Sequence, residues 1–110
     1  MLTNLDYLKS ITEANDAMMR ELITIFKEQV AELSVALKDA YDKQDWDNLS
    51  KLAHKAKSTV AVVGINDLAA ELKNLELWAH ERKNTESYAK IVEKFIFVCK
   101  EALNELKEYL

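Results

Sequence analysis

Apolar residues recur at steps of three and four along most of this chain, which is the period of one face of an α-helix. The longest such pattern covers residues 16–42 and is interrupted by one polar position, Gln29. Asn15 precedes it, and an asparagine side chain can accept hydrogen bonds from the first free N–H groups of a helix. We therefore predict a long helix over residues 16–42, preceded by a short helix near residues 3–11.

The most regular pattern follows Asp45, which is placed to cap a third helix. Its apolar positions are spaced by 3, 4, 3, 4 and 3 residues: Trp46, Leu49, Ala53, Ala56, Val60 and Val63. Gly64 is the only glycine of the chain, and it can end this helix because glycine adopts left-handed backbone conformations without strain. Asn66 is then expected to cap a fourth helix.

Two more helical patterns complete the chain. The fourth helix has its apolar face at Leu68, Leu72, Leu75 and Ala79. A polar link over residues 82–85 precedes a fifth helix, which we expect to continue to the C-terminus with its apolar face at Tyr88, Ile91, Phe95, Cys99, Ala102, Leu106 and Tyr109. Long helices joined by short links pack as antiparallel neighbours, so the pattern predicts an all-α, up-down four-helix bundle with a short N-terminal helix over one end.

Composition agrees with a helical chain that forms one domain over residues 1–110. The sequence has one glycine, no proline and 49% hydrophobic residues, so the residues that usually mark strands and tight turns are almost missing. No run reaches the roughly 18 consecutive apolar residues of a membrane span, and the N-terminus lacks the features of a signal peptide. We therefore expect a cytoplasmic protein that does not insert into membranes.

The charged and metal-binding residues exclude several functions. The formal net charge is −4 and no dense basic stripe occurs, which argues against nucleic acid as a partner. Cys99 is the only cysteine and there are two histidines, so an intramolecular disulfide and the usual structural zinc sites are excluded. We expect neither a resident metal nor a cofactor.

His54 is the main candidate for chemistry. It lies about 160° around the third helix from Ala56 and is therefore expected on the outer face, with Ser50 and Ser58 one turn before and after it. A neutral imidazole is a nucleophile and can carry a phosphoryl group, and Lys57 is near enough in sequence to contact that group. A lone surface histidine on a helix usually has no function, however, so position alone is a weak argument.

A wider motif strengthens the argument for His54. Ala53, His54, Lys57, Gly64 and the pair Leu75-Glu76 stand in a combination and spacing that resembles the histidine-containing phosphotransfer (HPt) family. The resemblance covers nearly the whole chain. It departs from the family at Ser58, where glycine usually follows the motif lysine and leaves room for a partner beside the histidine.

The resemblance implies a phosphoryl carrier in a phosphorelay and not an enzyme in its own right. His54 would be the phosphoacceptor, and Lys57 would offset the charge of the phosphohistidine. The partners would be receiver domains, which supply the aspartate and the Mg²⁺, and a hybrid sensor histidine kinase, and the chain would act as a monomer. Supporting or docking positions would be Ser58, Ala61, Val62 and, through its backbone, Gly64.

Other functions are less well supported. A helical scaffold that has kept the fold and lost phosphotransfer is the main alternative. An autophosphorylating kinase would need glycine-rich nucleotide-binding loops, which this chain lacks. Glu71 and Glu76 show no acid-base geometry with His54 from sequence alone, so a hydrolase is disfavoured. Four remaining residues of chemical interest are interpreted as structural or inert: Trp46, Trp78, His80 and Cys99.

Overall fold

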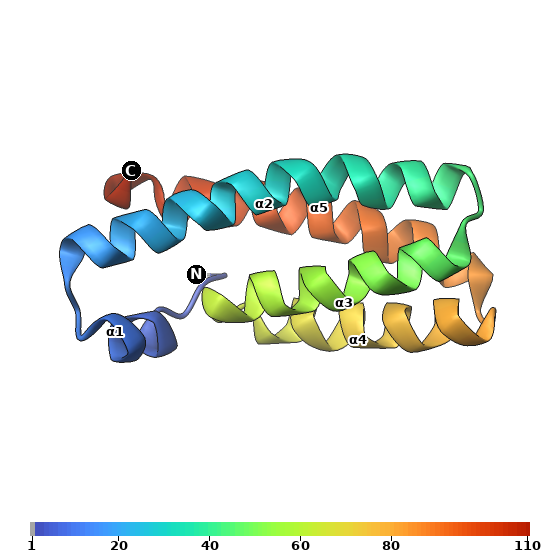
Figure 1. Cartoon of the computed structure of the whole chain (residues 1–110), viewed down its shortest axis with the longest axis horizontal. Coiled ribbons are helices and arrows are strands. Elements are labelled where there is room, and N and C mark those ends of the chain that lie inside the picture. Colours follow the sequence, from blue (N-terminus) through green and yellow to red (C-terminus); the bar gives the residue numbers. More distant parts are fainter. Residues whose placement is uncertain (1) are drawn as a thin grey trace.

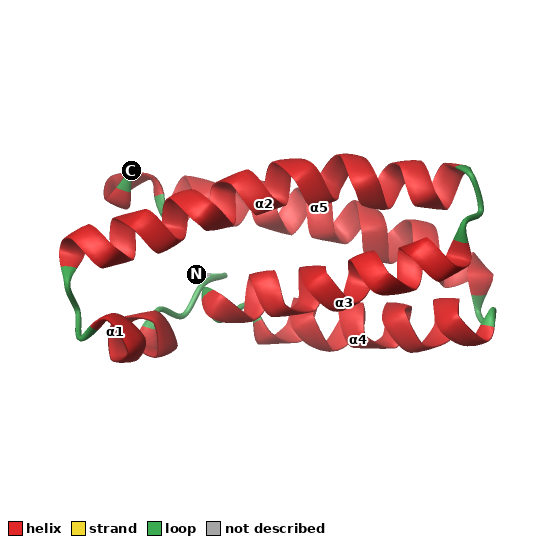
Figure 2. Ribbon diagram, in the orientation of Figure 1, coloured by secondary structure: helices red, strands yellow, loops and turns green. Residues whose placement is uncertain are grey.

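The computed structural model describes residues 2–110 and is helical throughout its regular structure. The elements are α1 (Asp6–Thr12), α2 (Asp16–Asp42), α3 (Trp46–Val62), α4 (Asn66–Glu81) and α5 (Tyr88–Glu105), with 3-10 turns at Thr85–Ser87 and Lys107–Tyr109. Figure 2 shows these helices joined by short loops. No strand occurs within residues 2–110, so the prediction of an all-α chain is confirmed.

The four long helices lie side by side in an elongated molecule of 42 × 21 × 20 Å. Neighbours in the chain, α2 with α3, α3 with α4 and α4 with α5, contact each other, and α2 also contacts α5. Figure 1 shows consecutive long helices running in opposite directions, with α1 beyond the ends of α3 and α4. None of the helices in residues 2–110 is both long and apolar enough to cross a membrane.

The starts of α2 and α3 follow the sequence prediction. The side chain of Asn15 accepts a hydrogen bond of 3.1 Å from the Met18 N–H, and that of Asp45 accepts one of 3.3 Å from the Asn48 N–H. These contacts satisfy N–H groups that have no partner inside the helix. Both predicted caps are therefore confirmed.

The start of α4 differs from the prediction. Asn66 is the first helical residue, and the preceding Ile65 occupies the cap position without any side-chain hydrogen bond. Gly64 does adopt the expected left-handed conformation, with φ of 75°. Ile65 is 5% exposed, and its N–H bonds the carbonyl of Val60. Burial of this apolar side chain at the turn therefore sets the cap one residue earlier than Asn66.

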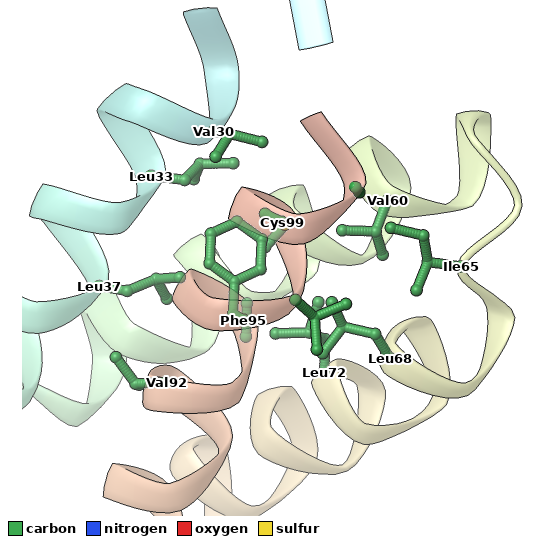
Figure 3. Packing of buried hydrophobic residues seen from close by; sticks show 14 of the residues in the cluster. Val30, Leu33, Leu37, Val60, Ile65, Leu68, Leu72, Val92, Phe95 and Cys99 are labelled. Carbon is green, nitrogen blue, oxygen red and sulfur yellow. The ribbon is translucent and has the colours of Figure 1, made fainter. Parts of the chain in front are cut away.

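The core contains the predicted apolar faces of all four long helices. Figure 3 shows the ring of Phe95 from α5 between side chains of α2 and of α4, including Leu37 and Leu72. Burying a side chain of this kind stabilises the fold by about 1.5–3 kcal/mol. Trp46 and Tyr109 were expected on the apolar faces, but they are only partly buried and lie at the margin of the core.

The segment before α1 packs against the rest of the bundle. The N–H groups of Leu2 and Thr3 and the Thr3 hydroxyl donate to the carboxylate of Glu105, at 2.8, 3.1 and 3.0 Å. The Asn4 N–H donates to the Val63 carbonyl at 2.9 Å. These bonds keep residues 2–5 out of helical geometry, so the first helix begins at Asp6 and not near residue 3.

Two details at α3 and α5 complete the fold. A Cβ on Gly64 would lie 2.1 Å from the Asn4 carbonyl oxygen, so this turn requires glycine for space as well as for its positive φ. The fifth helix was expected to reach the C-terminus, but α5 ends at Glu105 and a 3-10 turn follows. The carbonyl of Tyr109 in this turn accepts a hydrogen bond of 3.2 Å from the Arg20 side chain on α2.

Candidate functional site

His54 lies in the middle of α3 on its exposed side. Its neighbours Ala53 and Ala56 are both fully buried, which fixes the rotation of α3 and turns residue 54 away from the core. The His54 side chain is 63% exposed. The prediction that this imidazole faces solvent is therefore confirmed, and a second protein can reach it.

One nitrogen of the His54 ring is held by α4. His54 Nδ1 lies 3.0 Å from Oε2 and 3.1 Å from Oε1 of Glu76. Glu76 is 22 residues further along the chain but lies beside His54 because α3 and α4 pack against each other. The carboxylate is 25% exposed, so it is partly sheltered from water while the imidazole is not.

This contact decides which nitrogen of the ring is free. An ionised carboxylate can only accept hydrogen bonds, so the nitrogen facing Glu76 carries the proton in the neutral imidazole. His54 Nδ1–H therefore donates to Glu76, and the lone pair of the neutral ring is on Nε2. Nε2 is the atom available as a nucleophile.

Lys57 completes a three-residue cluster. Its Nζ lies 3.3 Å from Glu76 Oε1, and its side chain is 28% exposed. Partial burial tends to raise the pKa of the Glu76 carboxyl, but the hydrogen bonds and charges of His54 and Lys57 outweigh it and lower the pKa below its ordinary value. Glu76 is therefore a carboxylate at neutral pH and links the histidine to the lysine.

Ser50 was expected on the same outer face as His54, and this expectation is wrong. The residue is 8% exposed, and its hydroxyl donates a hydrogen bond of 2.7 Å to the carbonyl oxygen of Glu76. The cause is that α4 covers this side of α3. This hydrogen bond connects α3 to the α4 backbone one turn from His54. It thereby helps to fix the position of Glu76 along the axis of α3, next to the imidazole.

The other predicted positions lie near His54 with different exposure. Ser58 and Ala61 are exposed, whereas Val62 and Gly64 are partly buried. Gly64 lies under the segment before α1, where its role is to let Asn4 approach the backbone. Ser58, Ala61 and Val62 thus belong to the face of α3 that carries His54, and Gly64 belongs to the turn beyond it.

The residues interpreted as structural or inert have environments that fit that interpretation. Trp46 and Trp78 are partly buried, and the Trp46 ring packs edge-on against Tyr88 with 5.0 Å between ring centroids. Cys99 is buried, and this burial raises the pKa of its thiol to about 12, so it stays protonated. His80 is exposed on α4.

The contact between Glu76 and His54 is the feature that sequence reasoning missed. Leu75-Glu76 was recognised as part of the motif, but its geometry relative to His54 was not. Leu75 belongs to the apolar face of the fourth helix, so the sequence does indicate that Glu76 lies at the edge of the interface between α3 and α4. Which residue of α3 it meets depends on how the two helices are aligned.

Within residues 2–110, no group of three or more histidine, cysteine, aspartate or glutamate side chains is arranged to hold a metal ion.

Comparison with known proteins identifies a family. The chain matches the family model of the Hpt domain over residues 21–109, a range that contains α3 with His54 and α4 with Glu76. Searches of curated proteins and of solved structures gave no match.

Proposed function

Because this chain belongs to the Hpt domain family, whose members carry phosphoryl groups on histidine in phosphorelays, we propose that His54 is the phosphoacceptor of this chain. The observation that carries the proposal is the hydrogen bond from His54 Nδ1 to Glu76. It leaves Nε2 of the exposed imidazole unprotonated. In this arrangement the protein holds a nucleophile ready without any further catalytic group.

The transfer step is an in-line displacement at phosphorus. The lone pair of His54 Nε2 attacks the phosphorus of a phosphoaspartate, a nitrogen–phosphorus bond forms, and the aspartate carboxylate leaves with the electrons of the broken oxygen–phosphorus bond. The phosphorylated ring carries a positive charge that Glu76 stabilises through Nδ1–H. The reverse displacement by a second aspartate returns the imidazole to its starting state.

Lys57 has a different part in this step. Its ammonium group is bound to Glu76 in the absence of phosphate, and it lies on the α4 side of His54. A phosphoryl group on Nε2 adds about two negative charges near this ammonium group. The ammonium group can then donate a hydrogen bond to a phosphoryl oxygen. We therefore assign Lys57 the role of stabilising the phosphohistidine.

We assign the remaining chemistry to the partners. A receiver domain would supply the aspartate and the Mg²⁺ that neutralises the transferring phosphoryl group, and a hybrid sensor histidine kinase would be the source of phosphate. The chain itself would be a carrier without kinase activity. Ser58, Ala61 and Val62 would line the face on which the receiver docks.

We also propose that the chain is an up-down four-helix bundle and a single domain. The ring of contacts among α2, α3, α4 and α5 supports this arrangement. The predicted domain covers residues 1–110, of which Met1 lies outside the described residues. A monomeric state and a cytoplasmic location remain predictions.

The experiment that tests the function is phosphoryl transfer from radiolabelled, phosphorylated receiver domains to the wild-type chain. We expect label that is lost in acid and stable in alkali, as a phosphoramidate is, and we expect its complete loss in His54→Gln. His80→Gln is the matched control and should accept label at the wild-type rate.

Two results would overturn the proposal. Label that persists in His54→Gln would place the phosphoryl group on another residue. Failure of the wild-type chain to accept label from any receiver of a broad panel would favour the scaffold alternative, in which the bundle binds partners without phosphotransfer.

A further inference from the structure

The charge of the chain is unevenly divided among its helices. α3 contains three lysines and one aspartate, whereas α2 contains six acidic and three basic residues and α4 contains four acidic residues and one lysine. α1 and α5 each have equal numbers of both signs. In a chain of net charge −4, the helix that carries His54 is thus the only one of these five with a net positive charge.

The two sides of His54 on α3 are not equivalent. Ser50 and Lys57 lie about 40° and 60° to one side on the helical wheel, and both contact Glu76 of α4. Lys51 and Lys55 lie about 60° and 100° to the other side, and both are exposed. α4 therefore covers one flank of the histidine and leaves the flank with Lys51 and Lys55 open.

The charges on this open flank are not compensated. Within residues 2–110, neither Lys51 nor Lys55 has a carboxylate within 4 Å, whereas Lys57 is paired with Glu76. Asp47, the only acidic residue of α3, is 3.4 Å from Arg82 instead. The two ammonium groups thus project an unpaired positive field beside the nucleophile. We call Lys51 and Lys55 the lysine edge.

We propose that the lysine edge is the docking determinant that selects this chain's partner, namely a receiver domain with an acidic rim beside its phosphoaspartate. The inference rests on the proposed function and specifies its partner. A site that holds phosphoaspartate and Mg²⁺ is built from carboxylates, so negative charge near its mouth is chemically expected. If the receiver domain has carboxylates on the side that faces the lysine edge, they would contact Lys51 and Lys55 while His54 reaches the phosphorus.

The expected effect is on association. Exposed, unpaired charges act on a partner over about 10 Å at moderate salt, which speeds encounter and fixes orientation more than it strengthens the final complex. Neither lysine has to leave an existing ion pair in order to act. Phosphoryl transfer from the matching receiver should therefore be fast at low salt and should slow as salt is raised.

The test compares two double variants with equal change in net charge. Lys51→Glu/Lys55→Glu reverses the lysine edge, and Lys90→Glu/Lys100→Glu reverses two exposed lysines of α5 that lie outside any ion pair within residues 2–110. The probes are purified receiver domains, phosphorylated with acetyl phosphate, that span a range of surface charge. The readout is kcat/KM for transfer to His54 at several salt concentrations, together with the hydrolysis rate of the phosphohistidine.

For receivers with an acidic rim, we expect the lysine-edge variant to lose at least about tenfold in kcat/KM at low salt and to lose the salt dependence. The α5 variant should stay within about twofold of wild type, since its charges are remote from His54. The hydrolysis rate of the phosphohistidine should not change in either variant. Where the double Glu variant does not fold, Lys51→Gln/Lys55→Gln should give the same trend with a smaller loss.

Equal loss in the two variants would overturn the docking role while leaving phosphotransfer intact, since net charge alone would then explain the effect. An equally fast reaction with receivers whose rim is not acidic would also overturn it. If the wild-type chain accepts no phosphoryl group from any receiver, the proposed function itself fails, and this outcome is distinct from both of the others.

Discussion

The chain offers two exposed histidines for comparison, His54 on α3 and His80 on α4. At His54 one ring nitrogen is held 3.0 Å from the Glu76 carboxylate, and Lys57 is bound to the same carboxylate. Within residues 2–110, the imidazole of His80 makes no side-chain hydrogen bond or ion pair. Both rings are open to solvent, so exposure does not distinguish them.

The difference comes from the interface between α3 and α4. His54 lies where Glu76, partly sheltered by this interface, can fix a proton on Nδ1, and its ring is therefore both oriented and nucleophilic at a defined atom. His80 is exposed one turn after Glu76 on the same helix, and no carboxylate within residues 2–110 holds either of its ring nitrogens. A solvent-exposed histidine becomes a candidate for chemistry when a neighbouring helix controls one of its nitrogens.

Apart from replacing His54 itself, removing the Glu76 side chain should do most to abolish the difference between His54 and His80. We expect Glu76→Ala to slow phosphoryl acceptance by about 10- to 100-fold, because the ring loses its orientation and its defined tautomer. Glu76→Gln keeps an oxygen that can accept from Nδ1–H and should be several-fold less damaging than Glu76→Ala. The measurement is the rate of labelling by a phosphorylated receiver.

Glu81→Ala serves as the control for Glu76, because it removes the same charge from an exposed position at the end of α4. It should leave the labelling rate unchanged. If the Glu76→Ala variant accepted label as fast as wild type, the contact with Glu76 would not be what distinguishes His54 from His80.

A smaller effect is expected from Lys57. Lys57→Gln should reduce phosphoryl transfer about tenfold, since a charge-assisted hydrogen bond to a phosphoryl oxygen is replaced by a neutral one. It should also shorten the lifetime of the phosphohistidine, which can be followed by loss of label after removal of the receiver. Lys73→Gln on the exposed side of α4 is the control. An unchanged lifetime in Lys57→Gln would contradict the assigned role.

The smallest expected effect is on stability in acid. The pKa of the Glu76 carboxyl is lowered in the folded chain, so the folded state binds this proton less readily than the unfolded state. Its contribution to the free energy of unfolding is therefore present above the ordinary value of 4.5 and is lost as the pH falls through the lower folded pKa. For a partly exposed cluster the contribution is about 1 kcal/mol or less.

Urea unfolding of wild type and Glu76→Gln at pH 7 and at pH 3 measures the contribution of the Glu76 carboxylate to the free energy of unfolding. The two chains should differ most at pH 7, and their difference should shrink as the pH falls below 4.5, whereas no such change should occur for His80→Gln. A constant difference at both pH values would mean that the side chain matters for packing and not through its charge.

Much of the site follows from sequence periodicity. The spacing of the apolar residues in α3 defines the buried side, and His54 is opposite to it, so its exposure could be predicted from a single helix. The bounds of α2 and the caps at Asn15 and Asp45 were also predictable, because capping depends on residues that are close in sequence.

The remaining features depend on contacts between segments that are distant in sequence. Ser50 is polar and was placed outside, but its burial depends on where α4 lies across α3. The pairing of His54 with Glu76 depends on the alignment of the same two helices, which periodicity leaves open. The cap of α4 at Ile65 likewise follows from burial of that side chain at a turn, and a helical wheel does not contain this information.

The hydrogen bonds from Leu2 and Thr3 to Glu105 have a consequence for the folding kinetics. They join groups separated by 103 and 102 residues, so closing them requires that the bundle has already brought its first and last segments together. We expect contacts of this kind to form after the rate-limiting step and to contribute little to the speed of folding. They would then act mainly by slowing the opening of the finished bundle, so the segment before α1 would lengthen the lifetime of the native chain more than it helps the chain to reach that state.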